Sequence, residues 1–161
     1  MTQLLCPVCG MDVTGSEITA EHIGIVYHFC SEQCQENFTA RPGLYAGKGA
    51  QKPEGKTLIK RRTFALECPL VDAEADAMKA ALLRMMGVRD VDISGLKVAV
   101  TYDLLEATAA QIGREIEQAG AKVGKGWSER LKRGWVRYTE ETELENLAAG
   151  DASCCNRPPH A

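Results

Sequence analysis

The sequence lacks any apolar stretch long enough to cross a membrane, which takes about 18 to 20 uncharged apolar residues. Even residues 78–88 are interrupted by Lys79 and Arg84. The sequence also lacks a basic N-terminal segment followed by an apolar run, as in a secretory signal. We therefore expect a cytoplasmic protein with no membrane insertion. In such a reducing compartment, closely spaced cysteines are more often metal ligands or redox groups than disulfides.

Large aromatic side chains are few, and positive charge is not in excess. Three Phe, four Tyr and two Trp among 161 residues leave few anchors for one extensive core, which favours two small domains. With 19 Lys and Arg against 22 Asp and Glu, the net charge of -3 predicts no nucleic-acid partner. The one basic cluster, residues 60–62, is expected to be the solvated start of a strand rather than a binding patch.

Motifs for catalysis are missing as well. The sequence contains no Gly-rich phosphate-binding loop and no histidine near a cysteine with a clear orienting carboxylate. We therefore expect a protein that is not an enzyme.

Composition divides the chain into segments. Residues 47–56 are rich in Gly, Lys and Pro and separate four of the seven cysteines from a region with periodic apolar residues. The predicted divisions are a four-cysteine module at 1–46, a linker at 47–57, a second domain at 58–126, a helical extension at 127–150 and a flexible tail at 151–161.

The second domain shows the element order βαββαβ. The pattern predicts strands at 63–66, 88–93, 96–102 and 121–124, with helices at 72–86 and 108–119. Gly87 and Gly120 follow the two helices, as glycine often does at a helix end, and residues 94–95 form a hairpin turn. This order predicts a ferredoxin-like sandwich, in which two helices cover one face of a four-stranded antiparallel sheet, and hence an α+β fold.

The C-terminal extension contains a periodic apolar set. Trp127, Leu131, Trp135 and Tyr138 are spaced to form one face of a helix. We expect this face to dock onto the sheet, because a small domain gains stability by covering apolar area. A helix that binds a partner is the alternative. The tail after residue 150 has no periodicity and is expected to be disordered.

Two cysteine pairs in the first 45 residues predict a metal site. Cys6 and Cys9 are three apart and are followed by a glycine, which suits a knuckle that turns both sulfurs toward one ion. Cys30 and Cys34 bracket a predicted helix start, where i, i+4 spacing places both sulfurs on one face. Ser31 is the expected cap of this helix. Four thiolates suit a tetrahedral soft ion, zinc or copper(I).

The role of this site remains open from the sequence. Zinc held by four cysteines commonly serves only to fold a small module, whereas a trafficking or sensing role needs exchange of the ion. His28, or His22 further back, is a less favoured replacement ligand, since the register of residues 23–29 decides where His28 points.

These residues carry a family resemblance. The motif residues are Cys-Pro-Val-Cys-Gly-Met at 6–11, Tyr-His-Phe-Cys-Ser at 27–31, and Cys34, Phe38, Pro42 and Tyr45. Over about residues 4–46 the chain resembles the YHS and TRASH metal-binding modules. The resemblance implies a small treble-clef or zinc-finger-like fold, found in proteins that sense, carry or resist heavy metals. TRASH modules commonly show three cysteines, so Cys6 is an additional candidate ligand.

Residues 62–125 resemble the heavy-metal-associated domain of copper chaperones and metal-transporting ATPases. The matching stretches are 82–88, 98–103 and 112–123. That family binds its ion with a Gly-Met-x-Cys-x-x-Cys loop. Here Val71 and Glu74 occupy the two ligand positions, and Cys68 lies three residues upstream of the first. The domain is therefore expected to be degenerate as a metal binder.

The remaining cysteines suggest a second thiolate site. Cys68 is either a buried small apolar residue or a reactive thiol on the loop where the family holds metal. Cys154 and Cys155 in the tail can complete a site with Cys68 for copper(I) or mercury(II), or can hand metal to a partner.

The leading hypothesis is a cytoplasmic heavy-metal-binding protein that traffics or detoxifies a thiophilic ion by thiolate exchange. The resemblance points to a metal-transporting ATPase or a metal-responsive regulator as partner. One alternative is an interaction module with a structural zinc. Another is a thiol redox enzyme that uses Cys68 or the Cys154-Cys155 pair, which needs an electron donor that the sequence does not show.

Overall fold

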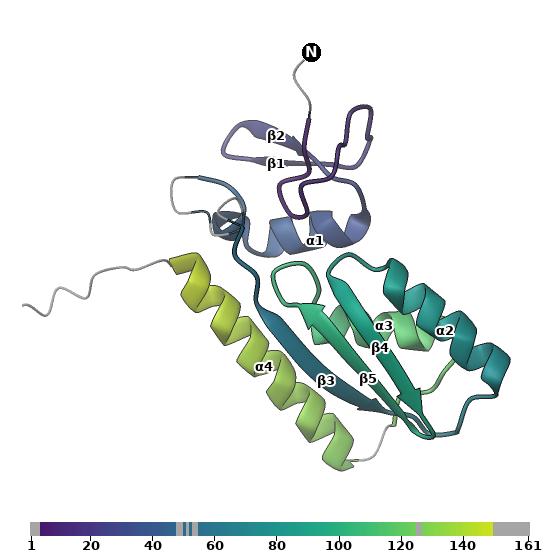
Figure 1. Cartoon of the computed structure of the whole chain (residues 1–161). Helices are drawn as coiled ribbons and strands as arrows, with labels where there is room; N and C mark the ends of the chain where they lie inside the picture. The colour runs from purple at the N-terminus through teal and green to yellow at the C-terminus, as the bar shows by residue number, and fades with distance from the viewer. Residues whose placement is uncertain (1–3, 48–49, 51, 53–54, 125–126, 150–161) are drawn as a thin grey trace, which may run out of the picture.

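The computed structural model describes residues 4–47, 50, 52, 55–124 and 127–149, the side chains of 127–129 excepted. Its first part is a cysteine-bearing loop followed by a hairpin and a helix (Figure 1). The elements are β1 (Thr19–His22), β2 (Ile25–His28), α1 (Glu32–Ala40) and the 3-10 helix η1 (Pro42–Leu44). A knuckle, a hairpin and a helix in this order form the expected treble-clef-like module.

The turn between β1 and β2 is strained. Ile23 and Gly24 both have positive φ angles, 51° and 73°, as a two-residue type I′ hairpin turn requires. Glycine adopts this backbone freely, but a β-branched residue there is an outlier. Ile23 is also 85% exposed, so its side chain gains little from packing.

We therefore predict that Ile23→Asn stabilises the protein by about 1 kcal/mol, because asparagine tolerates the left-handed backbone far better than isoleucine. Chemical denaturation of the two proteins measures the difference. Val26→Asn is the matched control, since Val26 is also exposed but lies in β2. An equal gain in both variants would show that replacing an exposed apolar side chain, and not relief of the turn, is responsible.

The second part has the predicted α+β, ferredoxin-like arrangement. Its elements are β3 (Ile59–Ala65), α2 (Asp72–Arg84), β4 (Val88–Ser94), β5 (Lys97–Asp103) and α3 (Ala109–Gln118). The three strands form an antiparallel sheet in the order β3-β5-β4. Phe64, Val98 and Val100 point to one face, which packs on Leu82 of α2 and on Ile112 and Ile116 of α3. The alternate strand positions, such as Arg61, Thr63 and Thr101, point to the other face of the sheet.

The predicted last strand at 121–124 is much shorter than expected. It is reduced to an isolated antiparallel bridge between Leu66 and Val123. Gly124 donates a backbone hydrogen bond to the carbonyl of Ala65, and Glu67 donates one to Lys122, at 2.8 and 2.9 Å. The fourth strand of the fold is therefore started at the outer edge of β3 and not continued. Beyond it the chain forms α4 (Trp127–Ala149), which runs along β3 (Figure 1).

Helix α4 docks through polar as well as apolar contacts. The carboxylate of Glu140 is buried, with 3% of the residue exposed, and accepts hydrogen bonds from the Tyr102 hydroxyl and from the Ala109 backbone amide. Lys60 pairs with Glu143 at 2.8 Å. Residues 60–62 were expected to be solvated, but this lysine and Arg62, 3.7 Å from Glu140, instead hold α4 against β3.

The prediction that the aromatic face of α4 packs on the sheet is wrong. Leu131, Trp135 and Tyr138 are 63%, 69% and 66% exposed. The helix instead turns Glu140 and Leu144 inward, and Leu144 is 3% exposed. The spacing of apolar residues thus correctly predicted a helix with these residues on one face. The buried carboxylate of Glu140 on the opposite face determines which face packs against the rest of the protein.

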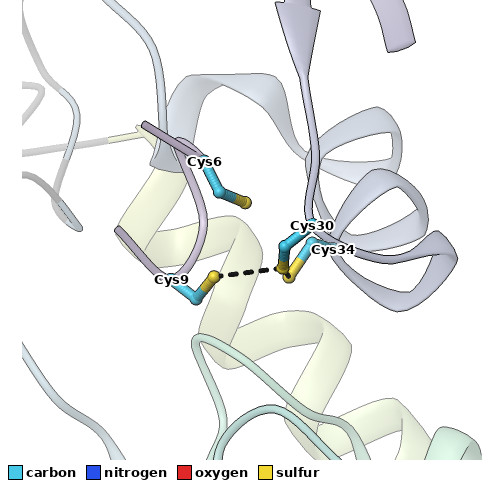
Figure 2. Close-up of side chains that lie close together, drawn as sticks. All are labelled: Cys6, Cys9, Cys30 and Cys34. Carbon is cyan, nitrogen blue, oxygen red and sulfur yellow. Dashed lines mark hydrogen bonds between the residues drawn. The ribbon is translucent and has the colours of Figure 1, made fainter. Parts of the chain in front are cut away.

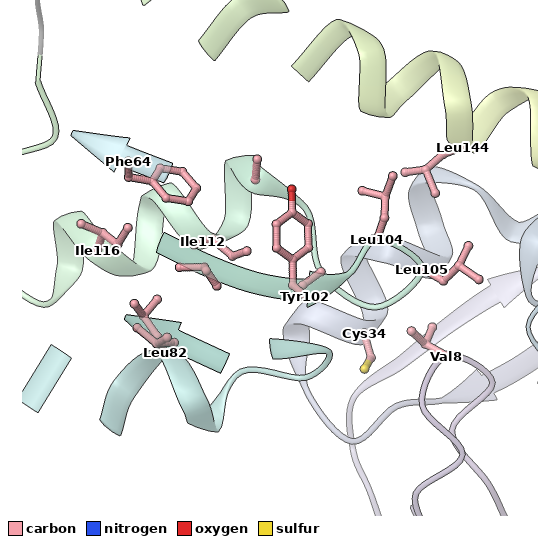
Figure 3. Close-up of a cluster of buried hydrophobic side chains, with 14 of the residues drawn as sticks. Val8, Cys34, Phe64, Leu82, Tyr102, Leu104, Leu105, Ile112, Ile116 and Leu144 are labelled. Atoms are coloured by element: carbon pink, nitrogen blue, oxygen red, sulfur yellow. The ribbon is translucent and has the colours of Figure 1, made fainter. Parts of the chain in front are cut away.

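The two parts of the chain share one core (Figure 3). Val8 and Cys34 of the first module belong to the same buried cluster as Leu104 and Leu105 of the β5–α3 loop and Leu144 of α4. The module that carries the four cysteines is therefore packed onto the second part. No helix within the described ranges is sufficiently long and apolar to span a membrane.

Candidate metal centre

The first cysteine pair lies in a tight loop. The Gly10 amide donates to the Cys6 carbonyl, and the Cys6 amide donates to Met11, both at 2.8 Å. Gly10 takes a φ of 77°, a left-handed conformation that glycine adopts without a Cβ clash. These bonds close the loop, so the side chains of Cys6 and Cys9 project from one turn, as the sequence predicted for a knuckle.

The second pair flanks the start of α1. Ser31 is the N-cap, and its side chain accepts a hydrogen bond from the Cys34 amide at 3.3 Å, as expected. The prediction that Cys30 and Cys34 share one face of a helix is wrong, because Cys30 precedes the cap and lies outside α1. Their sulfurs nevertheless lie 3.5 Å apart.

All four sulfurs converge on one point (Figure 2). They lie within 4.8 Å of one another, with Cys9 and Cys30 separated by 3.3 Å and Cys30 and Cys34 by 3.5 Å. A tetrahedral ion with metal-sulfur distances of about 2.3 Å separates its ligand sulfurs by about 3.8 Å. The cluster therefore fits a four-thiolate ion with only small side-chain adjustments.

Protons are held unevenly by these thiols. Hydrogen bonds from Cys34, and next from Cys9, hold the pKa of Cys6 far below its usual range. The pKa of Cys34 is raised, first by its hydrogen bond with Cys6, then by its hydrogen bond with Cys9 and by burial. The pKa of the Cys9 thiol is raised to about 12. A hydrogen bond with Cys34 lowers this pKa, but a hydrogen bond with Cys6 and burial together raise it by more. An ion that binds all four sulfurs must displace the protons of the neutral thiols.

Burial divides the cluster into two sides. Cys6 and Cys34 are 2% and 0% exposed and belong to the apolar core. Cys9 and Cys30 are only partly buried. Two of the cysteines thus lie in the core, and the other two lie on the less buried side of the cluster.

Polar side chains of α1 brace this site against the second part of the chain. Gln33, next to Cys34 in the sequence, donates through Nε2 to the carbonyls of Met86 and Glu106 at 2.8 and 2.9 Å. Asn37 donates to the same Glu106 carbonyl. Sequence analysis missed these residues, because a polar residue on a short helix gives no sign of the distant carbonyl that it contacts.

Further contacts hold the end of the first module. The Tyr45 hydroxyl donates to the Leu105 carbonyl at 2.9 Å. Lys52, in the segment predicted as a flexible linker, lies 2.6 Å from the Glu106 carboxylate and 3.5 Å from that of Asp103. At least this linker residue is therefore anchored to the β5–α3 loop.

Neither histidine lies with the four sulfurs. The Nδ1 atom of His28 is 3.1 Å from the Ser16 carbonyl oxygen, which ties the ring to the neighbouring loop. His22 packs edge-on against Phe38, with ring centroids 6.0 Å apart. Among the described residues, the side chains that lie close enough together to share an ion are those of the four cysteines.

Cys68 is exposed and lies in the loop between β3 and α2, so the interpretation of a buried apolar residue is wrong. It stands apart from the four-sulfur cluster. Cys154 and Cys155, the other members of the predicted second site, lie outside the described residues. Val71 and Glu74, at the positions of the missing ligands, lie at the start of α2, where the Glu74 carboxylate accepts from the Val71 amide at 3.3 Å.

Known proteins resemble separate parts of the chain. Residues 6–48 match the YHS domain family, and no curated protein matches the sequence. One similar structure is a CopZ metallochaperone, at 24% identity over 40% of this chain and 100% of that chain, with a TM-score of 0.39. Oxidized MerP from Ralstonia metallidurans CH34 has 19% identity over 42% and 96% of the two chains, with a TM-score of 0.39.

The N-terminal soluble domains of Bacillus subtilis CopA have 27% identity over 42% of this chain and 48% of that chain, with a TM-score of 0.40. For the second part, the element order and the strand order seen in the structure itself show the ferredoxin-like fold. Residues 6–48 thus match the YHS domain family, and the part that follows has the ferredoxin-like fold.

Proposed function

We propose that Cys6, Cys9, Cys30 and Cys34 hold a thiophilic metal ion, zinc or copper(I), and that the protein passes this ion to a partner by thiolate exchange. The observation that carries this proposal is the uneven burial of the four cysteines. A closed structural site needs no accessible ligand. A carrier needs some ligands that stay and some that an incoming thiolate can replace.

The exchange would run through the accessible side of the cluster. An incoming thiolate binds the ion next to Cys9 or Cys30, and one of these two sulfurs then leaves the ion and takes up a proton. Cys6 and Cys34 keep the ion in place during this step, because their side chains are fixed in the core. Each transfer replaces one metal-sulfur bond by another, so no oxidant or reductant is required.

Protons compete with the ion for the same sulfurs. Because ligation requires thiolates, the affinity for metal falls as the pH is lowered. The raised pKa values of Cys9 and Cys34 mean that these thiols hold their protons firmly and release them on metal binding. Acid therefore favours release of the ion, and alkaline conditions favour its retention.

The second domain would act as a platform in this account. It has the ferredoxin-like fold but carries Val71 and Glu74 where related domains carry ligand cysteines. Its β5–α3 loop supports the helix that contains Cys34. We place the protein in the cytoplasm, with a metal-transporting ATPase or a metal-responsive regulator as the partner that receives or supplies the ion. A resistance role belongs to the same proposal. A further site formed by Cys68, Cys154 and Cys155 would hold a second ion, separate from the four-cysteine site, of which Cys68 is not a ligand.

Transfer kinetics test the proposal. Protein loaded anaerobically with copper(I) or zinc is mixed with a chromophoric thiol chelator, and the absorbance of the chelator complex follows transfer. We expect transfer that accelerates with chelator concentration, because the incoming thiolate takes part in the step. Cys30→Ser should speed the loss of metal, whereas Cys68→Ser should leave the rate unchanged.

The opposite result supports the alternative function. Zinc that stays bound through days of competition, with a release rate independent of chelator concentration, indicates a closed site that opens only when the module unfolds. In that case the metal is structural and the protein is an interaction module.

A further inference from the structure

The outer edge of β3 has unpaired main-chain groups over residues 61–63, where α4 faces it across a groove. β3 is an edge strand of the described sheet, and its pairing on the outer side is the bridge near Ala65. The direction of main-chain N–H and C=O groups alternates along a strand. The Ala65 carbonyl points outward to the Gly124 amide, so the main-chain groups of Thr63 and Arg61 point outward too. No described residue hydrogen-bonds to them.

A groove of about 640 Å³ lies along this edge, lined by residues of β3, α3 and the N-terminal half of α4. This volume is within the range of ligand-binding clefts. Phe64, Val123 and Val136 provide apolar lining, and Trp135 stands at the rim with 69% of its surface exposed. Part of the space is there because the strand at 121–124 stops after one bridge.

Positively charged residues predominate in the lining of the groove. Among the described residues, its lining includes one carboxylate, that of Glu117. The cationic residues are Arg61, Arg62, Arg114, Lys132, Arg133 and Arg137. Arg62, Arg114 and Arg137 form ion pairs with acidic residues outside the groove. Arg61 and Lys132, on opposite walls, have no acidic partner among the described residues.

We infer that this groove binds an extended acidic peptide segment of another protein, which adds to the sheet as a strand beside β3. Free main-chain groups on an edge strand recognise another main chain, and alternate side chains of the added strand enter pockets beside it. Apolar side chains would face Phe64 and Val136, and carboxylates would face Arg61 and Lys132. A nucleic acid or a lipid surface would use the cations but not the strand edge.

The site is independent of the metal centre. The α4 residues that line the groove, 132–137, belong to the half of the helix that is remote from the YHS domain (Figure 1). Arg133 fixes the geometry of its end, since its guanidinium donates to the Gly124 carbonyl at 2.5 Å. A result that contradicts metal transfer would therefore not bear on peptide binding in the groove, and a result that contradicts peptide binding would not bear on metal transfer.

A direct test uses a fluorescent peptide of about eight residues that alternates Glu with Val, and the same peptide with Lys in place of Glu. Binding to the full-length protein is measured by fluorescence anisotropy. Thr63→Pro removes an outward main-chain donor at an edge position, where proline is tolerated by the fold. Arg61→Glu/Lys132→Glu reverses the charge of the groove. Lys79→Glu/Arg84→Glu makes the same change in charge on exposed positions of α2.

We expect the acidic peptide to bind, the basic one not to bind, and both groove variants to weaken binding by about tenfold or more. The α2 variant should bind as the wild type does. If the Thr63→Pro variant keeps the melting temperature of the wild type and binds the acidic peptide with the same affinity, strand addition is overturned. If oligothymidylate binds as tightly as the acidic peptide, and Thr63→Pro weakens neither, the groove binds anions in general. If the protein forms a dimer that Thr63→Pro abolishes, the occupant is a second copy of the chain. Both results would overturn the inference.

Discussion

Cys34→Ser should weaken metal binding by more than about 100-fold. Loss of an outer-shell partner alone costs about 10 to 100-fold in metal affinity, and Cys34 is one of the two sulfurs fixed in the core. Serine is nearly isosteric but does not supply a thiolate. Competition with a chelator of known affinity, on anaerobically purified protein, gives the change directly.

The same substitution should lower the stability of the YHS domain. Free energy of metal binding is also free energy of folding in small metal-supported modules. We therefore expect a lower melting temperature in the metal-loaded variant than in the metal-loaded wild type. Cys68→Ser is the matched control, because this exposed cysteine lies outside the cluster. Equal metal affinity in Cys34→Ser and Cys68→Ser would rule out Cys34 as a ligand.

Glu140→Ala should destabilise the protein by about 2–4 kcal/mol. The substitution leaves the Tyr102 hydroxyl and the Ala109 amide without their acceptor in a buried position. Each unsatisfied buried donor costs about 1–3 kcal/mol. Loss of the carboxylate also removes the acceptor through which α4 meets the start of α3. Urea denaturation measures the change in the free energy of unfolding.

Glu141→Ala provides the comparison within the same helix. Glu141 makes a surface ion pair with Arg137 at 2.7 Å, and such pairs contribute at most about 1 kcal/mol. If Glu140→Ala and Glu141→Ala cost the same, the buried network does not hold α4 in place.

Local patterns predicted the framework of the site. Cysteine spacing, a glycine after the knuckle and a serine before α1 are short-range signals, and the structure brings the four sulfurs together as they indicated. The βαββαβ order likewise followed from apolar periodicity and turn residues. These features depend on residues within a few positions of one another, so they can be read from the chain.

Long-range features escaped prediction. The docking face of α4 depends on Glu140 reaching Tyr102 and Ala109, more than 30 positions away. The last strand stops early, although its residues suit a strand, because the chain leaves the edge of β3 after Gly124 to form α4. Gln33 reaches carbonyls of the second domain. In each case the deciding partner is remote in sequence, and a residue type alone does not reveal it.

The joint between the YHS domain and the ferredoxin-like domain links the metal centre to the rest of the chain. Cys34 lies between Ser31 and Asn37 on α1, and the same helix donates hydrogen bonds to the β5–α3 loop. Ordering of the helix start by a bound ion would therefore also order this joint.

X-ray absorption spectroscopy on the full-length protein loaded with zinc tests the central claim most directly. The account predicts a shell of four sulfurs at about 2.3 Å with no nitrogen or oxygen ligand. Cys30→Ser should reduce the sulfur count, and His28→Ala should leave the spectrum unchanged. A shell with a nitrogen ligand that disappears in His28→Ala, or a sulfur count unaffected by Cys30→Ser, would contradict the four-cysteine centre.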